Sequence, residues 1–447
     1  MKKGEGHIIY FLGIGGIGMS ALARYFRSQG FSIAGYDLTP SSLTKQLEDE
    51  GMSIHYTDDP KAIPASTELV IYTPAIPSTS LELAEIKRRG IRMIKRAEAL
   101  GEISKEHFTI AISGTHGKTT TTAMVAHILC ESGRDTTAFI GGIANNFNSN
   151  LHLGQTSDST LVAEADEFDR SFLKLHPDIS IVNSIDADHL DIYGDREHLI
   201  ASFNDFVALT SGCVIYKEGL PIKDCENHIR FGFSADCDYQ ISNIEQCEGI
   251  TKFAISNSGK RISLTIPMAG QHNVLNATAA YIAAKQTGIS DEEIAHAMTT
   301  FKGVRRRFDI RVNSKGHYYI DDYAHHPEEI KSCLSAIRAS FPNRKITLVF
   351  QPHLFTRTRD FMEEFANTLA MADELILLDI YPARELPIEG ITSQALLERV
   401  PLTNKIVCPK DELIQLVERE RPELLVTMGA GNIDRFVEPL EKMIATW

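Results

Sequence analysis

Two glycine-rich loops, each between an apolar run and a helix-like segment, constrain this chain more than any other feature. GIGGIG at residues 13–18 follows HIIYFL, and GTHGKT at residues 114–119 follows FTIAIS. A glycine loop between a strand and a helix lets backbone N–H groups approach a phosphate at the positive end of the helix. The sequence therefore predicts two anion-binding loops, each opening a strand-to-helix unit of a helix-covered sheet.

Strand-like and helix-like segments alternate along most of the 447 residues, and a chain of this length normally forms two or three domains. We expect an α/β fold with a Rossmann-like N-terminal domain (1–106), a central P-loop ATPase-like domain (107–310) and a Rossmann-like C-terminal domain (311–447). The polar stretch EISKEH, residues 102–107, is the expected linker between the first two domains. Short alternating segments between about residues 213 and 267 predict a small antiparallel sheet.

Composition excludes several classes of protein. The formal net charge is -14 and no block of Lys or Arg occurs, which disfavours nucleic acid and anionic membranes as partners. There is no apolar run of about 18 residues and no signal-peptide pattern, so we expect a cytoplasmic protein without membrane insertion. Seven dispersed cysteines without a C-x-x-C pair predict neither a disulfide framework nor a thiolate zinc site. The oligomeric state stays open, with a homodimer as one alternative.

The first glycine loop fits the G-x-G-x-x-G pattern of a dinucleotide or nucleotide-diphosphate site. Its candidate binding residues are Gly13, Gly15, Gly16 and Gly18. Asp37, at the end of the next strand, could accept hydrogen bonds from sugar hydroxyls. The alternative is a tight strand-to-helix turn without a ligand.

The second glycine loop resembles a P-loop but has Ile112 where the first glycine is expected. Lys118 would neutralise the β- and γ-phosphates of a nucleotide, and the Thr119 hydroxyl would bind Mg²⁺. The candidate nucleotide-binding residues are Gly114, Thr115, His116, Gly117, Lys118, Thr119 and Thr120.

Acidic residues follow the next two apolar strands, where a parallel sheet presents its ligands. Glu164 ends TLVAE and is the best candidate for a Mg²⁺ ligand, while Asp186, Asp188 and His189 follow SIVNSI. Imidazole is an unusual partner for Mg²⁺, which sets His189 apart. The alternative is that the aspartates cap the helices that follow.

Further polar clusters lie near the boundary of the third domain and within it. Asn273 and Asn276 stand one helical turn apart, so both could reach one partner such as an adenine edge. The run GVRRRFD places three arginines at the boundary, where at least one should meet phosphate or carboxylate unless the run is a solvated linker. Strand ends in the third domain supply Asp322, His325, His326, His353 and Arg357.

Together these motifs resemble the Mur ligases, ATP-dependent amino-acid ligases of peptidoglycan precursor synthesis. GTHGKTTTT, EADE, DADHLDIYG, HNVLNA, RRFD and DDYAHHP occur in the family's order. The family's phosphate loop begins at the position of Gly114, so Ile112 is no defect. GIGGIGMSALA, SFLKLHP and QPHLFTRT are similar to the family member that adds the first amino acid.

This resemblance implies a function and a role for each candidate residue. It implies ligation of L-alanine to the carboxylate of UDP-N-acetylmuramate through an acyl phosphate, with the first loop holding UDP and the second holding ATP. Implied catalytic residues are Lys118, Glu164, His189, Arg307 and Asp322, with Thr119, Glu164 and His189 on Mg²⁺, Asn273 and Asn276 on adenine or the acyl group, and His325, His353 and Arg357 on substrate. Leu354 stands where a basic residue is expected, which leaves Arg357 as the main candidate for the alanine carboxylate.

Three other functions compete with this interpretation. A ligase that recycles a tripeptide onto UDP-N-acetylmuramate would share the ATP site. A nicotinamide-dependent dehydrogenase would explain the first loop but leave Lys118 and Glu164 without a purpose. A nucleotide-binding scaffold without activity is the third alternative.

Overall fold

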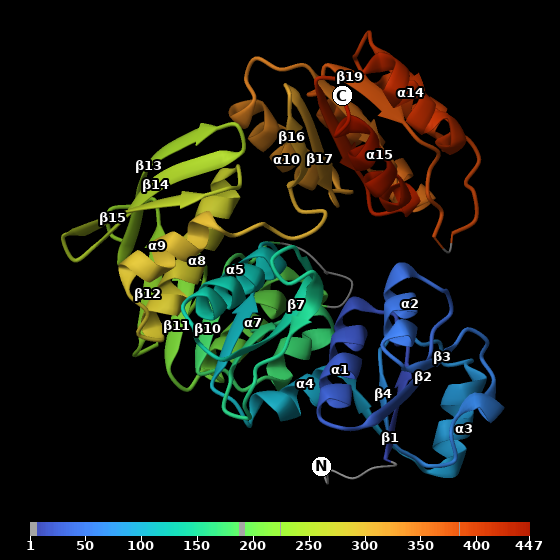
Figure 1. Cartoon of the computed structure of the whole chain (residues 1–447), viewed down its shortest axis with the longest axis vertical. Helices are drawn as coiled ribbons and strands as arrows, with labels where there is room; N and C mark the ends of the chain where they lie inside the picture. Colours follow the sequence, from blue (N-terminus) through green and yellow to red (C-terminus); the bar gives the residue numbers. More distant parts are fainter. Residues whose placement is uncertain (1–6, 187–192, 224, 384) are drawn as a thin grey trace. The chain divides into compact units, whose positions relative to one another are not determined.

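The computed structural model describes residues 7–186, 193–223, 225–383 and 385–447. It forms two compact units, Met1–Ser242 with Ile255–Ile262 and Leu275–Met298, and Asn243–Ala254 with Ser263–Val274 and Thr299–Trp447. Three sheets organise the described residues, and the predicted three-domain α/β fold is confirmed (Figure 1). None of the described helices is long and apolar enough to cross a membrane.

The first sheet is entirely parallel and has the strand order β3-β2-β1-β4-β5. Its elements are β1 (Ile8–Leu12), α1 (Ile17–Ser28), β2 (Ser32–Tyr36), α2 (Ser42–Asp49), β3 (Ser53–His55), β4 (Thr67–Tyr72), α3 (Leu81–Arg89), β5 (Arg92–Lys95) and α4 (Arg96–Ser104). This order reverses direction beside β1, where the first glycine loop connects β1 to α1. Ligands of open α/β sheets bind at such a reversal.

The expected linker at residues 102–107 is wrong in its first half, because residues 102–104 complete helix α4. Apolar positions of that helix, Ala99 and Ile103, are buried in a core that also contains Phe26 of α1 and Leu161 of the central domain. The linker prediction relies on polarity, but Ile103 and Ser104 of this segment are buried. The first domain and the central domain therefore share one apolar core.

The central sheet contains ten strands in the order β15-β14-β13-β12-β11-β10-β6-β9-β7-β8. Its elements are β6 (Thr109–Ser113), α5 (Lys118–Glu131), β7 (Thr136–Ala144), β8 (Ser149–His152), β9 (Thr160–Glu164), β10 (Ile179–Val182), α7 (Arg196–Ala208), β11 (Cys213–Lys217), β12 (His228–Gly232), β13 (Tyr239–Cys247), β14 (Ile250–Asn257), β15 (Lys260–Ile266), α8 (Gln271–Gln286) and α9 (Asp291–Thr299).

The expected separate antiparallel sheet between residues 213 and 267 is wrong for β11 and β12. Both strands pair in parallel with their neighbours and extend the central sheet. Beyond them, β13, β14 and β15 are joined by the two-residue turns Glu248-Gly249 and Ser258-Gly259, in which every residue has positive φ. Such turns connect antiparallel hairpins, so the antiparallel prediction holds only for these three strands.

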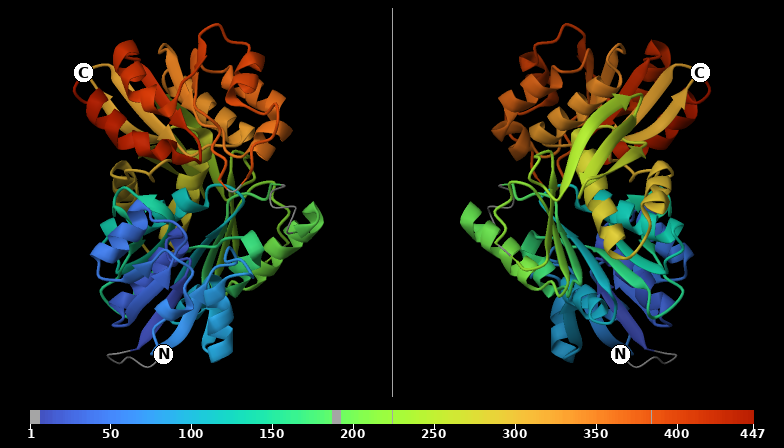
Figure 2. Two further views of the ribbon diagram at one scale, coloured as in Figure 1. Left: turned by 90° about the vertical axis from the view of Figure 1, so that its right-hand side faces the viewer. Right: turned by 90° about the vertical axis from the view of Figure 1, so that its left-hand side faces the viewer.

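The third sheet has the order β16-β17-β21-β18-β19-β20, and only β16 is antiparallel to its neighbour. Its elements are β16 (Asp309–Ser314), β17 (His317–Asp322), α10 (Pro327–Ser340), β18 (Ile346–Phe350), α11 (Phe355–Asp360), α12 (Met362–Leu369), β19 (Glu374–Leu377), α13 (Ser393–Arg399), β20 (Lys405–Val407), α14 (Leu413–Glu420), β21 (Leu424–Met428) and α15 (Val437–Ile444). Figure 2 shows α14 and α15 in red on one face and the orange helices on the other. Each face buries its own apolar cluster.

Candidate active site

The phosphate loop of residues 114–119 connects β6 to α5 at the carboxyl edge of the central sheet. β6 pairs in parallel with β9 and with β10, so the ends of both strands lie beside the loop. Gly117 has φ +81°, and a β-carbon there would lie 2.4 Å from Asn276 Oδ1. A side chain at Gly117 is therefore disfavoured both by the backbone conformation and by the neighbouring asparagine side chains. The loop presents bare backbone, as a phosphate cradle requires.

Lys118 at the start of α5 donates to three oxygen atoms of two residues. Its Nζ donates to both carboxylate oxygens of Glu167, at 2.9 and 2.8 Å, and to the Gly114 carbonyl oxygen at 2.7 Å. Glu167 is fully buried, and burial raises the pKa of its carboxyl, while the neighbouring Lys118 ammonium opposes that rise. Sequence reasoning missed Glu167, although it stands three residues after Glu164 in the same EADE motif.

A hydroxyl and a carboxylate meet at the next position of the loop. Thr119 Oγ1 donates to Glu164 Oε2 at 2.9 Å, and the Gly141 N–H donates to the same oxygen at 2.9 Å. Hard oxygen donors of this kind suit Mg²⁺, so the two side chains fit the ion that the sequence predicts. The third expected ligand, His189, lies outside the described residues, as does Asp188.

The loop is also fastened to the end of β10. Ser184 Oγ lies 2.9 Å from Thr115 Oγ1 and accepts the His116 N–H at 2.8 Å. Asp186 Oδ2 lies 3.6 Å from His116 Nε2, so this carboxylate faces the phosphate loop. Asn183 donates from Nδ2 to Thr121 Oγ1, while its buried Oδ1 has no hydrogen-bond partner in the described part of the chain.

The two asparagines of α8 differ in their surroundings. Asn276 lies against Gly117 of the phosphate loop. Asn273 Nδ2 donates to the Ala269 carbonyl oxygen at 2.7 Å. Both residues lie inside the helix, so neither is its N-cap. Contact with adenine or an acyl group stays a prediction for both asparagines.

The first glycine loop is braced by Asp37. The Gly15 N–H donates to Asp37 Oδ2 at 2.8 Å, and the Thr39 N–H donates to Oδ1 at 3.2 Å. Gly16 is the N-cap of α1 and provides no side-chain cap, so the first N–H groups of this helix lack a partner within the helix. The four predicted glycines and Asp37 therefore come together around one helix N-terminus.

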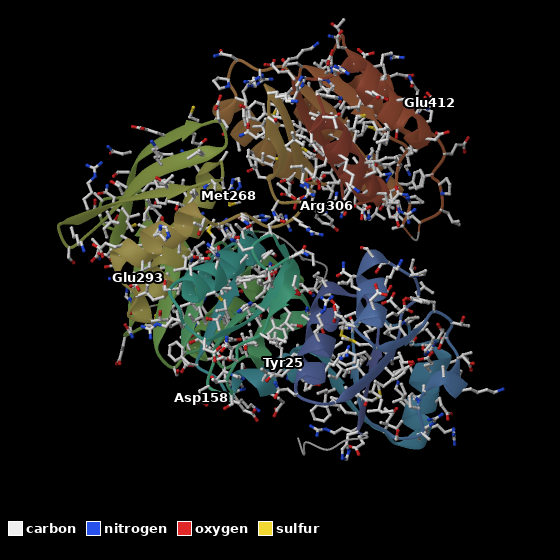
Figure 3. The ribbon with its side chains drawn as sticks, viewed as in Figure 1. Tyr25, Asp158, Met268, Glu293, Arg306 and Glu412 are labelled. Atoms are coloured by element: carbon white, nitrogen blue, oxygen red, sulfur yellow. The ribbon has the colours of Figure 1, made fainter. Side chains whose placement is uncertain are left out.

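In the third domain, the arginine run is held by two consecutive aspartates of β17. Arg306, labelled in Figure 3, donates from Nε to Asp321 Oδ2 at 3.1 Å. Asp322 accepts the Phe308 N–H at 2.6 Å and the Ala324 N–H at 2.8 Å. Burial raises the pKa of both carboxyls, that of Asp321 to about 6. Arg307 stands between these two anchored residues, over the Tyr323 ring.

The predicted substrate residues His325, His353 and Arg357 form one cluster at the ends of β17 and β18. The two imidazole centroids are 6.1 Å apart, and Arg357 Nη1 lies 3.4 Å from His353 Nδ1. Burial lowers the pKa of both histidines, that of His353 to about 4 with the Arg357 and His325 charges adding to the effect. Asp360, the acidic residue three positions after Arg357, pairs with Arg359.

His326, also expected at this edge, is the N-cap of α10 and accepts the Glu328 N–H. The cluster instead gains Glu329, whose Oε2 accepts the His325 N–H at 3.0 Å. Sequence reasoning missed this carboxylate, although it stands four residues after His325, one helical turn away.

Comparison with known proteins covers nearly the whole chain. Three family models match: the Mur ligase family catalytic domain (residues 8–108), the Mur ligase middle domain (112–284) and the Mur ligase glutamate ligase domain (306–431). The UDP-N-acetylmuramate–L-alanine ligase of Cytophaga hutchinsonii is 48% identical, over 97% of this chain and 96% of that protein.

Solved structures of two kinds of ligase share the fold. The UDP-N-acetylmuramate-alanine ligase MurC of Thermotoga maritima superposes with a TM-score of 0.84 at 28% identity, covering 98% of this chain and 99% of that one. A murein peptide ligase from Psychrobacter arcticus gives 0.71 at 23% identity, covering 99% of each chain, which supports the fold alone. The phosphate loop and its Thr119–Glu164 pair agree with the full-length similarity, which shows that this chain belongs to the Mur ligase family.

Proposed function

We propose that this protein joins L-alanine to the carboxylate of UDP-N-acetylmuramate, converting ATP to ADP and phosphate. The observation that carries the proposal is 48% identity, over nearly the full length of both chains, to an enzyme named for this reaction. The site geometry agrees with it, because an ATP-type phosphate loop and a cluster of cationic and imidazole groups are both present. The reaction serves peptidoglycan precursor synthesis, and we infer a cytoplasmic location, where ATP is available.

Charge compensation is the main task in the first step. The muramate carboxylate attacks the γ-phosphate of ATP, forming an acyl phosphate and releasing ADP. Two anions must approach each other, so cationic groups have to lie beside the phosphate oxygens. Lys118 of the phosphate loop would supply one such group after it releases Glu167. Thr119 and Glu164 would hold Mg²⁺, which would neutralise phosphate charge when bound.

The second step joins the amine to the activated acyl group and releases phosphate. L-Alanine brings a carboxylate that needs a fixed cation, and Arg357 provides a guanidinium in the third domain. His353 is neutral at pH 7 because its pKa is lowered to about 4. A neutral imidazole beside Arg357 can accept a hydrogen bond from the alanine ammonium without repelling it.

Arg307 and Asp322 are assigned supporting roles at the third domain. One carboxylate oxygen of Asp322 accepts the N–H of Phe308, which directly follows Arg307, and the other accepts the N–H of Ala324, which directly follows Tyr323. Asp322 thus acts through the backbone that carries Arg307, and Arg307 is the group offered to substrate. Domain closure would complete the site, since no single domain holds all these residues.

Phosphate release assayed with UDP-N-acetylmuramate and separate amines tests the function. L-Alanine should support turnover that depends on ATP, while L-Ala-γ-D-Glu-meso-diaminopimelate should not exceed it. Hydroxylamine should trap a hydroxamate of UDP-N-acetylmuramate when ATP is present and alanine absent. Faster turnover with the tripeptide would assign the recycling function, and ATP-independent nicotinamide reduction would assign a dehydrogenase.

A further inference from the structure

Four acidic residues at positions 164–169, named here the acidic bridge, pair alternately with two different domains. Glu164 and Glu167 pair with Thr119 and Lys118 of the phosphate loop. Asp166 Oδ2 accepts Arg96 Nη2 at 3.1 Å, and Asp169 Oδ2 accepts Lys95 Nζ at 2.9 Å. Lys95 and Arg96 stand at the carboxyl end of β5 in the first domain. One short segment therefore connects the ATP loop with the edge of the first sheet.

Arg96 also lies directly against the first glycine loop. A β-carbon at Gly18 would be 2.6 Å from Arg96 Nη1 and 3.1 Å from its Cδ. The guanidinium thus lies beside Gly18 in the first turn of α1 (Ile17–Ser28), whose N-cap Gly16 offers no side-chain cap. A β-carbon at position 18 would make the Arg96 side chain shift from this position.

This placement of a cation needs an anion to balance it. The N-terminus of a helix carries a partial positive charge, so a guanidinium beside it is repelled unless a negative group lies between or next to them. Asp166 balances the charge of the Arg96 guanidinium from one side only, and the side chains of both residues are partly exposed. A diphosphate at the N-terminus of α1 would meet both the free N–H groups of the helix and the guanidinium.

We propose that Arg96 binds the diphosphate of the nucleotide sugar at the start of α1, and that its ion pair with Asp166 ties this contact to the acidic bridge. The inference rests on the proposed function for the identity of the sugar nucleotide. It adds a cation to a loop that sequence reasoning treated as glycines and Asp37 alone. The Arg96–Asp166 ion pair also connects the sugar-nucleotide site with the residues around Lys118.

Calorimetric titration of the full-length protein with UDP and with UDP-N-acetylmuramate, without ATP, tests the contact directly. Arg96→Ala should weaken binding of both by at least tenfold, and Arg96→Lys should restore part of the loss because it keeps the charge. Gly18→Ala should weaken binding similarly by moving the guanidinium. Arg92→Ala removes an exposed arginine of the preceding strand β5, so it is the matched control and should change binding by less than twofold.

Steady-state kinetics separate a substrate contact from a structural role. Arg96→Ala should raise KM for UDP-N-acetylmuramate at least tenfold and leave KM for ATP within threefold. Asp166→Asn keeps the guanidinium and should retain sugar-nucleotide affinity within threefold. The proposal is wrong if Arg96→Ala binds UDP as the unaltered protein does, or if Asp166→Asn loses as much affinity as Arg96→Ala. Wild-type binding of UDP-N-acetylmuramate without any ligation would overturn the proposed function and leave this inference standing.

Discussion

Lys118 and the buried Glu167 form a largely buried ion pair in which the lysine ammonium donates to both oxygens of the carboxylate, at 2.9 and 2.8 Å. The third donor of Lys118 is taken by the Gly114 carbonyl oxygen. An ammonium has three N–H donors, so Lys118 must release at least one of these acceptors to contact a phosphate. The carboxylate of Glu167 consequently competes with ATP for the same cation.

Glu167→Gln should make nucleotide binding tighter. The amide keeps the shape and one acceptor oxygen but removes the competing negative charge, so we expect the Kd for ADP to fall threefold to tenfold. Thermal stability should decrease, because removing one partner of a buried ion pair leaves the other charge uncompensated. Calorimetry with ADP and thermal unfolding measure the two effects, and an unchanged or raised Kd would show that the pair does not oppose binding.

Lys118→Ala should abolish ligation while UDP-N-acetylmuramate still binds. Loss of one fixed positive charge at a phosphoryl-transfer site costs several kcal/mol of barrier, about a thousandfold in rate. Lys105→Ala is the control, since Lys105 is an exposed lysine paired with Glu102. Phosphate release gives the rate and calorimetry gives the sugar-nucleotide affinity. Activity above a tenth of the wild-type rate would contradict the role of Lys118.

Gly117→Ala should raise KM for ATP at least tenfold. The new β-carbon would lie 2.4 Å from Asn276 Oδ1, so the loop or the asparagine beside it has to shift. Gly133→Ala is the matched control, because Gly133 also has positive φ, +72°, but no atom lies within 4 Å of its added β-carbon. Both variants carry the left-handed backbone strain of about 1–2 kcal/mol, and only Gly117→Ala carries the clash. Equal KM values for the two variants would show that the clash is relieved without moving the loop.

Arg357→Ala should raise KM for L-alanine at least tenfold and leave KM for ATP within twofold. The lost guanidinium serves one substrate only. Arg359→Ala, in the same helix α11, removes an exposed arginine paired with Asp360 and should leave both values unchanged. An alanine KM that stays the same in Arg357→Ala would place the carboxylate site elsewhere.

His353 should titrate near pH 4 in the folded protein. Burial lowers its pKa to about 4, with Arg357 and His325 disfavouring the charged ring and Glu385 opposing them. Because the folded pKa lies below the unfolded value of about 6.5, its stabilising contribution is present above pH 6.5 and is lost as pH falls toward 4. NMR titration of the imidazole and urea unfolding of His353→Asn between pH 4.5 and 7 check this. A midpoint near 6.5 would show that the ring is solvated.

The amino-acid sequence by itself determines the phosphate loop and the type of many strands and helices. Glycines at positions 114 and 117 were predicted at a phosphate loop, and both adopt positive φ there. The period of apolar residues predicted β1, β6 and β18 and the helices after them, because alternation and helix spacing are properties of the chain itself. Glu164 was placed beside Thr119 because parallel strands end at one edge of a sheet.

Tertiary structure decided which side chains share a contact. Nothing in the spacing distinguishes Glu167, which pairs with Lys118, from Asp166, which pairs with Arg96 of another domain. Likewise, the polar stretch after residue 101 completes α4, because Ile103 is buried in a core that it shares with the central domain. Sequence pattern fixes the strand or helix on which a residue stands, but its partner depends on how separate elements pack, and that depends on shape and burial over the whole domain.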